Sequence, residues 1–100
     1  MPASDSTVRV VDNPDRKRFE AYVGDELAGY VTYQVRPGVV VLVHTEVGSD
    51  FEGHGVGGHL ASAAFGQIRA RGLKVQPLCP FIVRYLGHHP ELADLVVGAE

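Results

Sequence analysis

The sequence predicts an α+β fold, an α/β sandwich in which an antiparallel β-meander is followed by a β-α-β crossover. Three observations carry this prediction. Apolar and polar residues alternate with the period of a strand through most of the first half of the chain. Apolar residues then recur at helical spacing between Leu60 and Ile68. A short strand-like segment follows over residues 73–79, and Pro80 is placed to open a second helix.

The first half of the chain divides into three or four strands, predicted over residues 8–11, 18–23, 27–35 and 39–47. Turn signals separate them, of which Asn13-Pro14-Asp15 and Arg36-Pro37-Gly38 are the clearest. Alternation in the third segment places Leu27, Val31, Tyr33 and Val35 on one face. The fourth segment is an almost continuous apolar run, which indicates a central strand covered on both faces.

The second half of the chain begins with a glycine-rich stretch, residues 48–58, that leads into the first helix. Arg69 and Arg71 suit the last turn of that helix, and Gly72 suits the position just past it. Pro90 begins a final short helix over residues 91–97. Residues 1–7 are polar and without period, so we expect a disordered tail followed by a single domain over residues 8–100.

Composition restricts the classes of function. One hundred residues are enough for one domain, and twelve acidic against nine basic residues give a net charge of −3. Dedicated nucleic-acid or anionic-membrane binders show the opposite balance, so neither partner is expected. The N-terminal residues lack the pattern of a signal peptide, and no apolar run is long enough to span a membrane. A single cysteine fits the reducing cytoplasm, where we expect the protein to reside.

The strongest local signal is the segment Glu52-Gly53-His54-Gly55-Val56-Gly57-Gly58 at the start of the first helix. Glycines let a ligand approach the main chain, and the free N–H groups of a helix start favour an anion. A pyrophosphate cradle is therefore predicted, the alternative being a flexible loop with a glycine-rich helix start. The spacing also matches a dinucleotide-binding fingerprint, but that fingerprint follows the first strand of a parallel unit, which is not the position here.

In this context the segment resembles the motif of the GCN5-related N-acetyltransferase superfamily, Gln/Arg-x-x-Gly-x-Gly/Ala. Gly55 and Gly57 fill its two small positions, and Glu52 stands where the family prefers Gln or Arg. The resemblance implies that five residues of this loop hold the pyrophosphate of acetyl-coenzyme A, namely His54, Gly55, Val56, Gly57 and Gly58.

Four segments in order make a narrower resemblance, to a minimal acetyltransferase-like family of chains about this size. They are residues 44–47 (His-Thr-Glu-Val), the glycine loop, residues 79–81 (Cys-Pro-Phe) with Tyr85, and residues 89–91 (His-Pro-Glu). The resemblance covers about residues 18–97 and implies a reduced fold without the N-terminal helices that shape the acceptor site in larger relatives. It also implies an acetyl acceptor with a primary amine, on a small molecule, a protein or a peptide.

Acetyl transfer to an amine needs a base, which His44 or Glu46 could supply. The two residues lie two apart on the predicted strand, on one face with Val40 and Leu42. The alternatives are a hydrogen-bonded core histidine and a surface carboxylate at the end of a strand. By resemblance, the main-chain amide of Val47 polarises the thioester carbonyl.

Two residues near the C-terminus complete the candidate site. Cys79 precedes Pro80 and is predicted to cap the second helix, where the helix dipole favours a thiolate. It could accept the acetyl group, line the site, or be an inert buried cysteine. By resemblance, Tyr85 would protonate the departing coenzyme A thiolate, the alternative being a half-buried core aromatic.

The sequence therefore favours an acetyl-coenzyme A-dependent N-acetyltransferase. The alternative is a non-catalytic module that binds coenzyme A or acyl-coenzyme A. The five histidines do not show the spacing of helical zinc ligands, so no metal is predicted. We expect a monomer or a weak homodimer.

Overall fold

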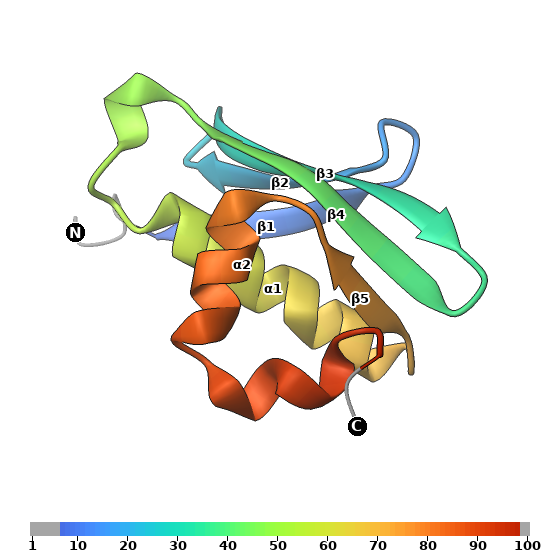
Figure 1. Cartoon of the computed structure of the whole chain (residues 1–100). Coiled ribbons are helices and arrows are strands. Elements are labelled where there is room, and N and C mark those ends of the chain that lie inside the picture. Colours follow the sequence, from blue (N-terminus) through green and yellow to red (C-terminus); the bar gives the residue numbers. More distant parts are fainter. Residues whose placement is uncertain (1–6, 99–100) are drawn as a thin grey trace.

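The computed structural model describes residues 7–98, which form a five-stranded mixed sheet with two α-helices (Figure 1). The sheet order follows the chain, with the first four strands antiparallel and the fifth parallel to the fourth. The strands are β1 (Val8–Asn13), β2 (Arg18–Val23), β3 (Glu26–Arg36), β4 (Val39–Val47) and β5 (Lys74–Pro77). The predicted fold class is confirmed, and the meander has four strands. Of the expected disordered tail, residues 1–6 lie outside the described residues.

Two α-helices and two 3-10 helices complete the described chain: η2 (Ser49–Phe51), α1 (Val56–Ala70), α2 (Pro80–Gly87) and η3 (Pro90–Leu95). Helix α1 connects β4 to the parallel strand β5, which is the predicted crossover. Gly72 follows α1 with a φ angle of 70°, as its predicted position past the helix requires. The final short helix is a 3-10 helix that begins at Pro90 and ends at Leu95. Across residues 7–98, no helix has the length and apolar character needed to cross a membrane.

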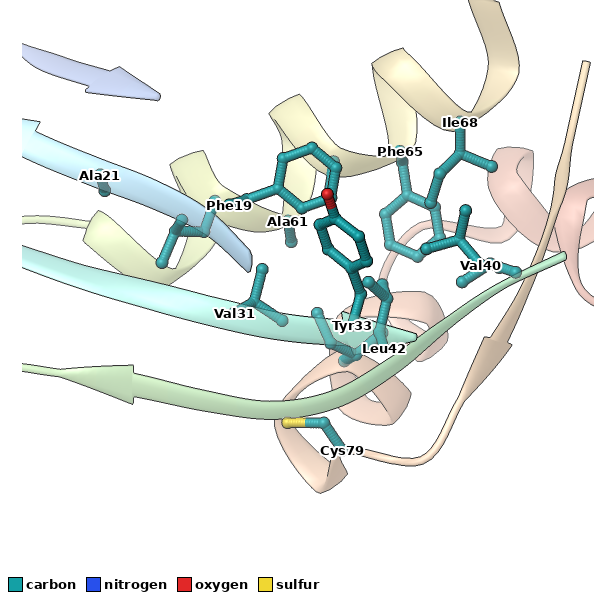
Figure 2. Close-up of a cluster of buried hydrophobic side chains, with 14 of the residues drawn as sticks. Phe19, Ala21, Val31, Tyr33, Val40, Leu42, Ala61, Phe65, Ile68 and Cys79 are labelled. Carbon is teal, nitrogen blue, oxygen red and sulfur yellow. The ribbon is translucent and has the colours of Figure 1, made fainter. Parts of the chain in front are cut away.

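The core lies between α1 and one face of the sheet, and Figure 2 shows its side chains meeting there. The apolar stripe predicted for α1 is fully buried: Leu60, Ala61, Ala64, Phe65 and Ile68. Helix α2 packs beside α1 and contributes the buried Ile82. Leu27 and Val35 are exposed rather than in the core. Leu27 is exposed because Ala28 is an extra residue in β3, which shifts the register of β3 against β2.

A second irregularity determines which face of β4 carries which side chain. Thr32 of β3 pairs with His44 but Tyr33 pairs with Leu42, so Val43 is an extra residue in β4. Such a bulge reverses the alternation beyond it. The prediction that His44 and Glu46 share a face with Val40 and Leu42 is therefore wrong. His44 and Glu46 lie on the face away from α1, and Thr45 points toward the core side.

One buried carboxylate, Glu20, lies on that opposite face of the sheet with 4% of its surface exposed. Its oxygens accept hydrogen bonds from Arg18 Nε (2.6 Å), the Tyr22 hydroxyl (2.9 Å) and Asn13 Nδ2 (3.2 Å). Burial alone would raise the pKa of Glu20, but these donors lower it overall. The Arg18 guanidinium also lies 4.5 Å from the centre of the Tyr30 ring. Glu20 thus organises polar side chains on β1, β2 and β3.

On the core side, Tyr33 ties the sheet to the end of α1. Its hydroxyl donates a 2.6 Å hydrogen bond to Asp12 of β1, and Asp12 also accepts one from Arg71, which caps α1. Burial and the bond to Asp12 raise the pKa of Tyr33 to about 12.

Replacing Tyr33 with phenylalanine should lower the free energy of unfolding by about 1–2 kcal/mol, because a buried hydrogen bond to a charged group is lost. The hydroxyl has a higher pKa in the folded state than the ordinary value of 10.0, so its stabilisation is complete below pH 10. It is then lost as the pH rises through about 12. Urea denaturation of both proteins should show the difference shrinking over this range. A difference that stays constant would contradict the assignment.

Candidate active site

The candidate site begins where β4 and β5 diverge. Their last pair is Leu42 with Pro77, and the Leu42 carbonyl then accepts hydrogen bonds from the N–H groups of Leu78 (2.9 Å) and Cys79 (3.3 Å). From there the chain turns into α2, while β4 continues to Val47 without β5 beside it. Cys79 therefore lies at the point where the two parallel strands separate.

Cys79 is buried, with 3% of its surface exposed, and it is the N-cap residue of α2, as predicted. Figure 2 shows it at the edge of the core, beside β4. Its Sγ lies 3.2 Å from the hydroxyl oxygen of Thr45. Burial would raise the pKa of the Cys79 thiol, but hydrogen bonding with the Thr45 hydroxyl and with the N–H groups of Ile82, Phe81 and Thr45 lowers it overall. Phe81 and Ile82 lie in the first turn of α2, where the positive end of the helix dipole also favours a thiolate.

His44 and Glu46 form a pair on the other face of β4. His44 Nε2 lies 2.8 Å from a carboxylate oxygen of Glu46, and the two side chains are 59% and 57% exposed. This exposure does not fit the alternative that His44 is a core histidine, whereas Glu46 is a surface carboxylate at the end of a strand, as its alternative describes. The pair can pass a proton between imidazole and carboxylate, and it is open to solvent. Thr45, between them in sequence, faces Cys79 instead.

The glycine loop ends at the first turn of α1. Gly53 and Gly55 have φ angles of 87° and 75°, a left-handed conformation that favours glycine, and Gly55 is the N-cap residue. The first hydrogen bond of α1 runs from the His59 N–H to the Gly55 carbonyl (3.0 Å). The N–H groups of the preceding residues of the helix therefore have no partner within it, and their dipoles favour an anion.

Two glycines of this loop have different surroundings. A Cβ at Gly58 would meet no atom within 4 Å, so the backbone there is open to a ligand. A Cβ at Gly57 would lie 2.7 Å from the ring of Phe81 in α2. Gly57 thus permits α2 to pack on the start of α1, and this contact brings Cys79 and the glycine loop into one neighbourhood. Within the same loop, the His54 side chain is exposed and the Val56 side chain is buried.

Val47 pairs with Gly29 at the end of β4 and packs against the core. A Cβ at Gly29 would lie 2.6 Å from the Glu46 carbonyl oxygen, so glycine allows β3 to approach β4 closely here. The assignment of the Val47 amide to a thioester carbonyl stays a prediction.

Tyr85 lies in α2 on the side that faces α1. Its ring stacks on Phe65 at 6.0 Å and on the imidazole of His89 at 4.1 Å, between ring centres. Tyr85 therefore packs against the core, six residues along the chain from Cys79. Its role as a proton donor to a thiolate stays a prediction.

Three predicted groups are thus close in the fold: Cys79, the end of β4, and the start of α1. Sequence reasoning missed Thr45 and Phe81, which make the contacts between them. Thr45 lay inside the segment that carried the resemblance, but only the bulge at Val43 turns it toward Cys79. Among the residues that the structure describes, no three His, Cys, Asp or Glu side chains are grouped as metal ligands would be.

Residues 18–95 match the family model described as GCN5-related N-acetyl-transferase. Protein NATD1 of Xenopus tropicalis is 32% identical over 87 residues, which is 85% of this chain and 80% of that protein. A solution structure of a GCN5-like protein from Staphylococcus aureus aligns with a TM-score of 0.67 and 25% identity, covering 97% of this chain and 93% of that one.

A more distant structure shares the fold alone. Ard1 from Thermoplasma volcanium aligns with a TM-score of 0.55 and 18% identity, over 66% of this chain and 45% of that one. The shared part is therefore less than half of the larger protein.

Proposed function

The chain belongs to the GCN5-related N-acetyltransferase family and is an N-acetyltransferase, and we propose that it transfers the acetyl group of acetyl-coenzyme A to a primary amine. The observation that carries the proposal is the start of α1. There the first N–H groups have no partner within the helix, and a Cβ at Gly58 would meet no atom within 4 Å.

Residues of the glycine loop fit a pyrophosphate. Residues 54–58 would hold its oxygens through their N–H groups, and no lysine or arginine of the loop is needed because the helix dipole supplies positive potential. The phosphate would lie over Gly55 and Gly58 rather than over the side of Gly57 that Phe81 occupies.

When bound, acetyl-coenzyme A supplies an acetyl group activated as a thioester. For transfer, the amine nitrogen must lose a proton and form a bond to the carbonyl carbon, while the carbon–sulfur bond breaks. We propose that Glu46 accepts the proton of the amine. His44, whose Nε2 lies 2.8 Å from a Glu46 carboxylate oxygen, would pass that proton to solvent. We assign stabilisation of the carbonyl oxygen to the Val47 amide. Tyr85 or the Cys79 thiol would return a proton to the coenzyme A thiolate.

The acceptor is proposed only as a class: a primary amine on a small molecule, a protein or a peptide. We propose that residues 8–100 act as one domain in the cytoplasm, as a monomer or weak homodimer, without a nucleic-acid or membrane partner. The net charge of −3 is compatible with a cationic amine.

The proposal is tested by two measurements on the same protein. Isothermal titration with acetyl-coenzyme A measures binding, and release of free coenzyme A thiol in the presence of mixed polyamines and lysine-containing peptides measures turnover. We expect binding and amine-dependent thiol release. Binding without turnover with any amine would favour a non-catalytic coenzyme A-binding module, and absence of binding would contradict the proposal.

Glu52 should weaken the cradle, because its exposed carboxylate lies at the start of the loop where a phosphate would sit. Replacing Glu52 with glutamine should tighten acetyl-coenzyme A binding by about two- to fivefold, the range expected when one exposed like charge is removed. Titrations at low and high salt provide the check, because a charge effect is screened by salt. An equal affinity for both proteins at low salt would show that Glu52 lies away from the phosphate.

A further inference from the structure

We propose that Thr45 is the positioning residue for Cys79: its hydroxyl holds the sulfur in a reactive, hydrogen-bonded state at the point where β4 and β5 separate. This inference rests on the proposed function, because it concerns a residue of the same site. It assigns a role to a residue that is not itself a candidate base or acid in the reaction.

The contact between the two residues is tertiary. They are 34 positions apart in sequence, on β4 and at the start of α2, and their side-chain atoms lie 3.2 Å apart. Hydrogen bonding from the backbone N–H groups of Thr45, Phe81 and Ile82 also lowers the pKa of the Cys79 thiol. Because N–H groups can only donate, the sulfur is placed as an acceptor, and a thiolate is the better acceptor. The Thr45 hydroxyl is then free to act as one more donor.

The position of Thr45 depends on the bulge at Val43. In a regular strand His44 would lie on the face of Leu42, toward α1, and Thr45 would lie on the opposite face. The extra residue reverses this order, so that Thr45 faces Cys79 and the His44–Glu46 pair faces solvent. The bulge at Val43 therefore places His44 and Glu46 on one face of β4 and Thr45, the partner of the Cys79 thiol, on the other.

The inference is tested on the thiol itself, which the chain makes simple because Cys79 is its one cysteine. The thiolate of Cys79 is followed by its ultraviolet absorbance as the pH rises, and its reactivity by alkylation with iodoacetamide at neutral pH. The variants are Thr45→Val, which removes the hydroxyl and keeps the shape, and Thr45→Ser, which restores a hydroxyl. Thr32→Val is the matched control, because Thr32 is paired with His44 and faces away from Cys79.

In Thr45→Val we expect the thiolate to appear at higher pH than in the wild type and alkylation to be about three- to tenfold slower. The lower thiolate fraction is partly offset by the greater nucleophilicity of a more basic thiol. Thr45→Ser should recover most of the rate, and Thr32→Val should match the wild type. A variant that is merely loosened would instead be alkylated faster over the whole pH range.

Wild-type behaviour of Thr45→Val, or a Thr45→Ser protein as slow as Thr45→Val, would overturn the inference. So would faster alkylation of Thr45→Val, because that result would make Thr45 a packing residue only. None of these measurements uses acetyl-coenzyme A. Failure of the proposed function therefore leaves their outcome unchanged, and the two failures are distinguishable.

Discussion

Replacing Gly58 with glutamate should reduce the affinity for acetyl-coenzyme A by about a hundredfold or more. A side chain at residue 58 enters open space beside the first turn of α1, so the fold can accommodate it. The new carboxylate would lie where the pyrophosphate is proposed to bind, and it would both occupy the site and repel a second anion. Glutamate in the first turn of a helix is otherwise favourable, so the variant should unfold at the same or a higher temperature than the wild type.

Gly66→Glu is the matched control for this variant. Gly66 belongs to the same helix, is exposed, and would also have no atom within 4 Å of a Cβ. It lies two turns further along α1, away from the loop. Isothermal titration should give wild-type affinity for Gly66→Glu. If Gly58→Glu also binds normally, the pyrophosphate lies elsewhere.

Gly57 is the wrong position for this experiment, although the sequence makes it look equivalent. A Cβ there would lie 2.7 Å from the Phe81 ring, so a glutamate would displace α2 as well as any ligand. Loss of binding in such a variant would report on packing between the helices and not on the cradle.

Replacing Glu46 with glutamine should lower kcat by about a hundredfold or more, because positioned acid–base groups contribute factors of this size. The affinity for acetyl-coenzyme A should stay unchanged, since Glu46 is exposed on the face of β4 away from α1. Glutamine keeps the shape of the side chain but cannot take the proton. Rates of thiol release with the amine that gives most turnover, measured at saturating acetyl-coenzyme A, provide the test.

Glu26→Gln controls for the loss of a surface carboxylate, because Glu26 is exposed at the start of β3 and pairs with Val23. It should retain the wild-type kcat. His44→Gln should resemble Glu46→Gln in direction, because the two side chains share a hydrogen bond. An unchanged kcat in Glu46→Gln would remove the pair from the mechanism.

The regular parts of the fold follow from local patterns that a sequence displays. The apolar residues from Leu60 to Ile68 fall on one face only if the segment is a helix. Proline is disfavoured in the interior of a helix, so Pro80 marks the start of one. The same logic placed Cys79 at the cap of α2. The expected relationship to the GCN5-related N-acetyltransferases is also confirmed, by the match over residues 18–95, whereas the roles of the individual motifs stay predictions.

What the sequence could not indicate are features decided by tertiary packing. The bulge at Val43 arises from the pairing of β3 with β4, and alternation alone put His44 and Glu46 on the wrong face. The burial of Glu20 is another such feature, because it depends on Asn13, Arg18 and Tyr22, whose side chains all hydrogen-bond to the carboxylate. Likewise, only the packing of Phe81 shows that Gly57 and Gly58 have different roles.

The central claim, that the start of α1 binds acetyl-coenzyme A, is tested most directly by the amide resonances of the protein. A titration of ¹⁵N-labelled protein with acetyl-coenzyme A should move the resonances of residues 54–58 and of Val47 most. The resonances of Tyr22 and Arg36, on β2 and β3, should stay in place. Shifts centred on another part of the chain, or none at millimolar ligand, would contradict the claim.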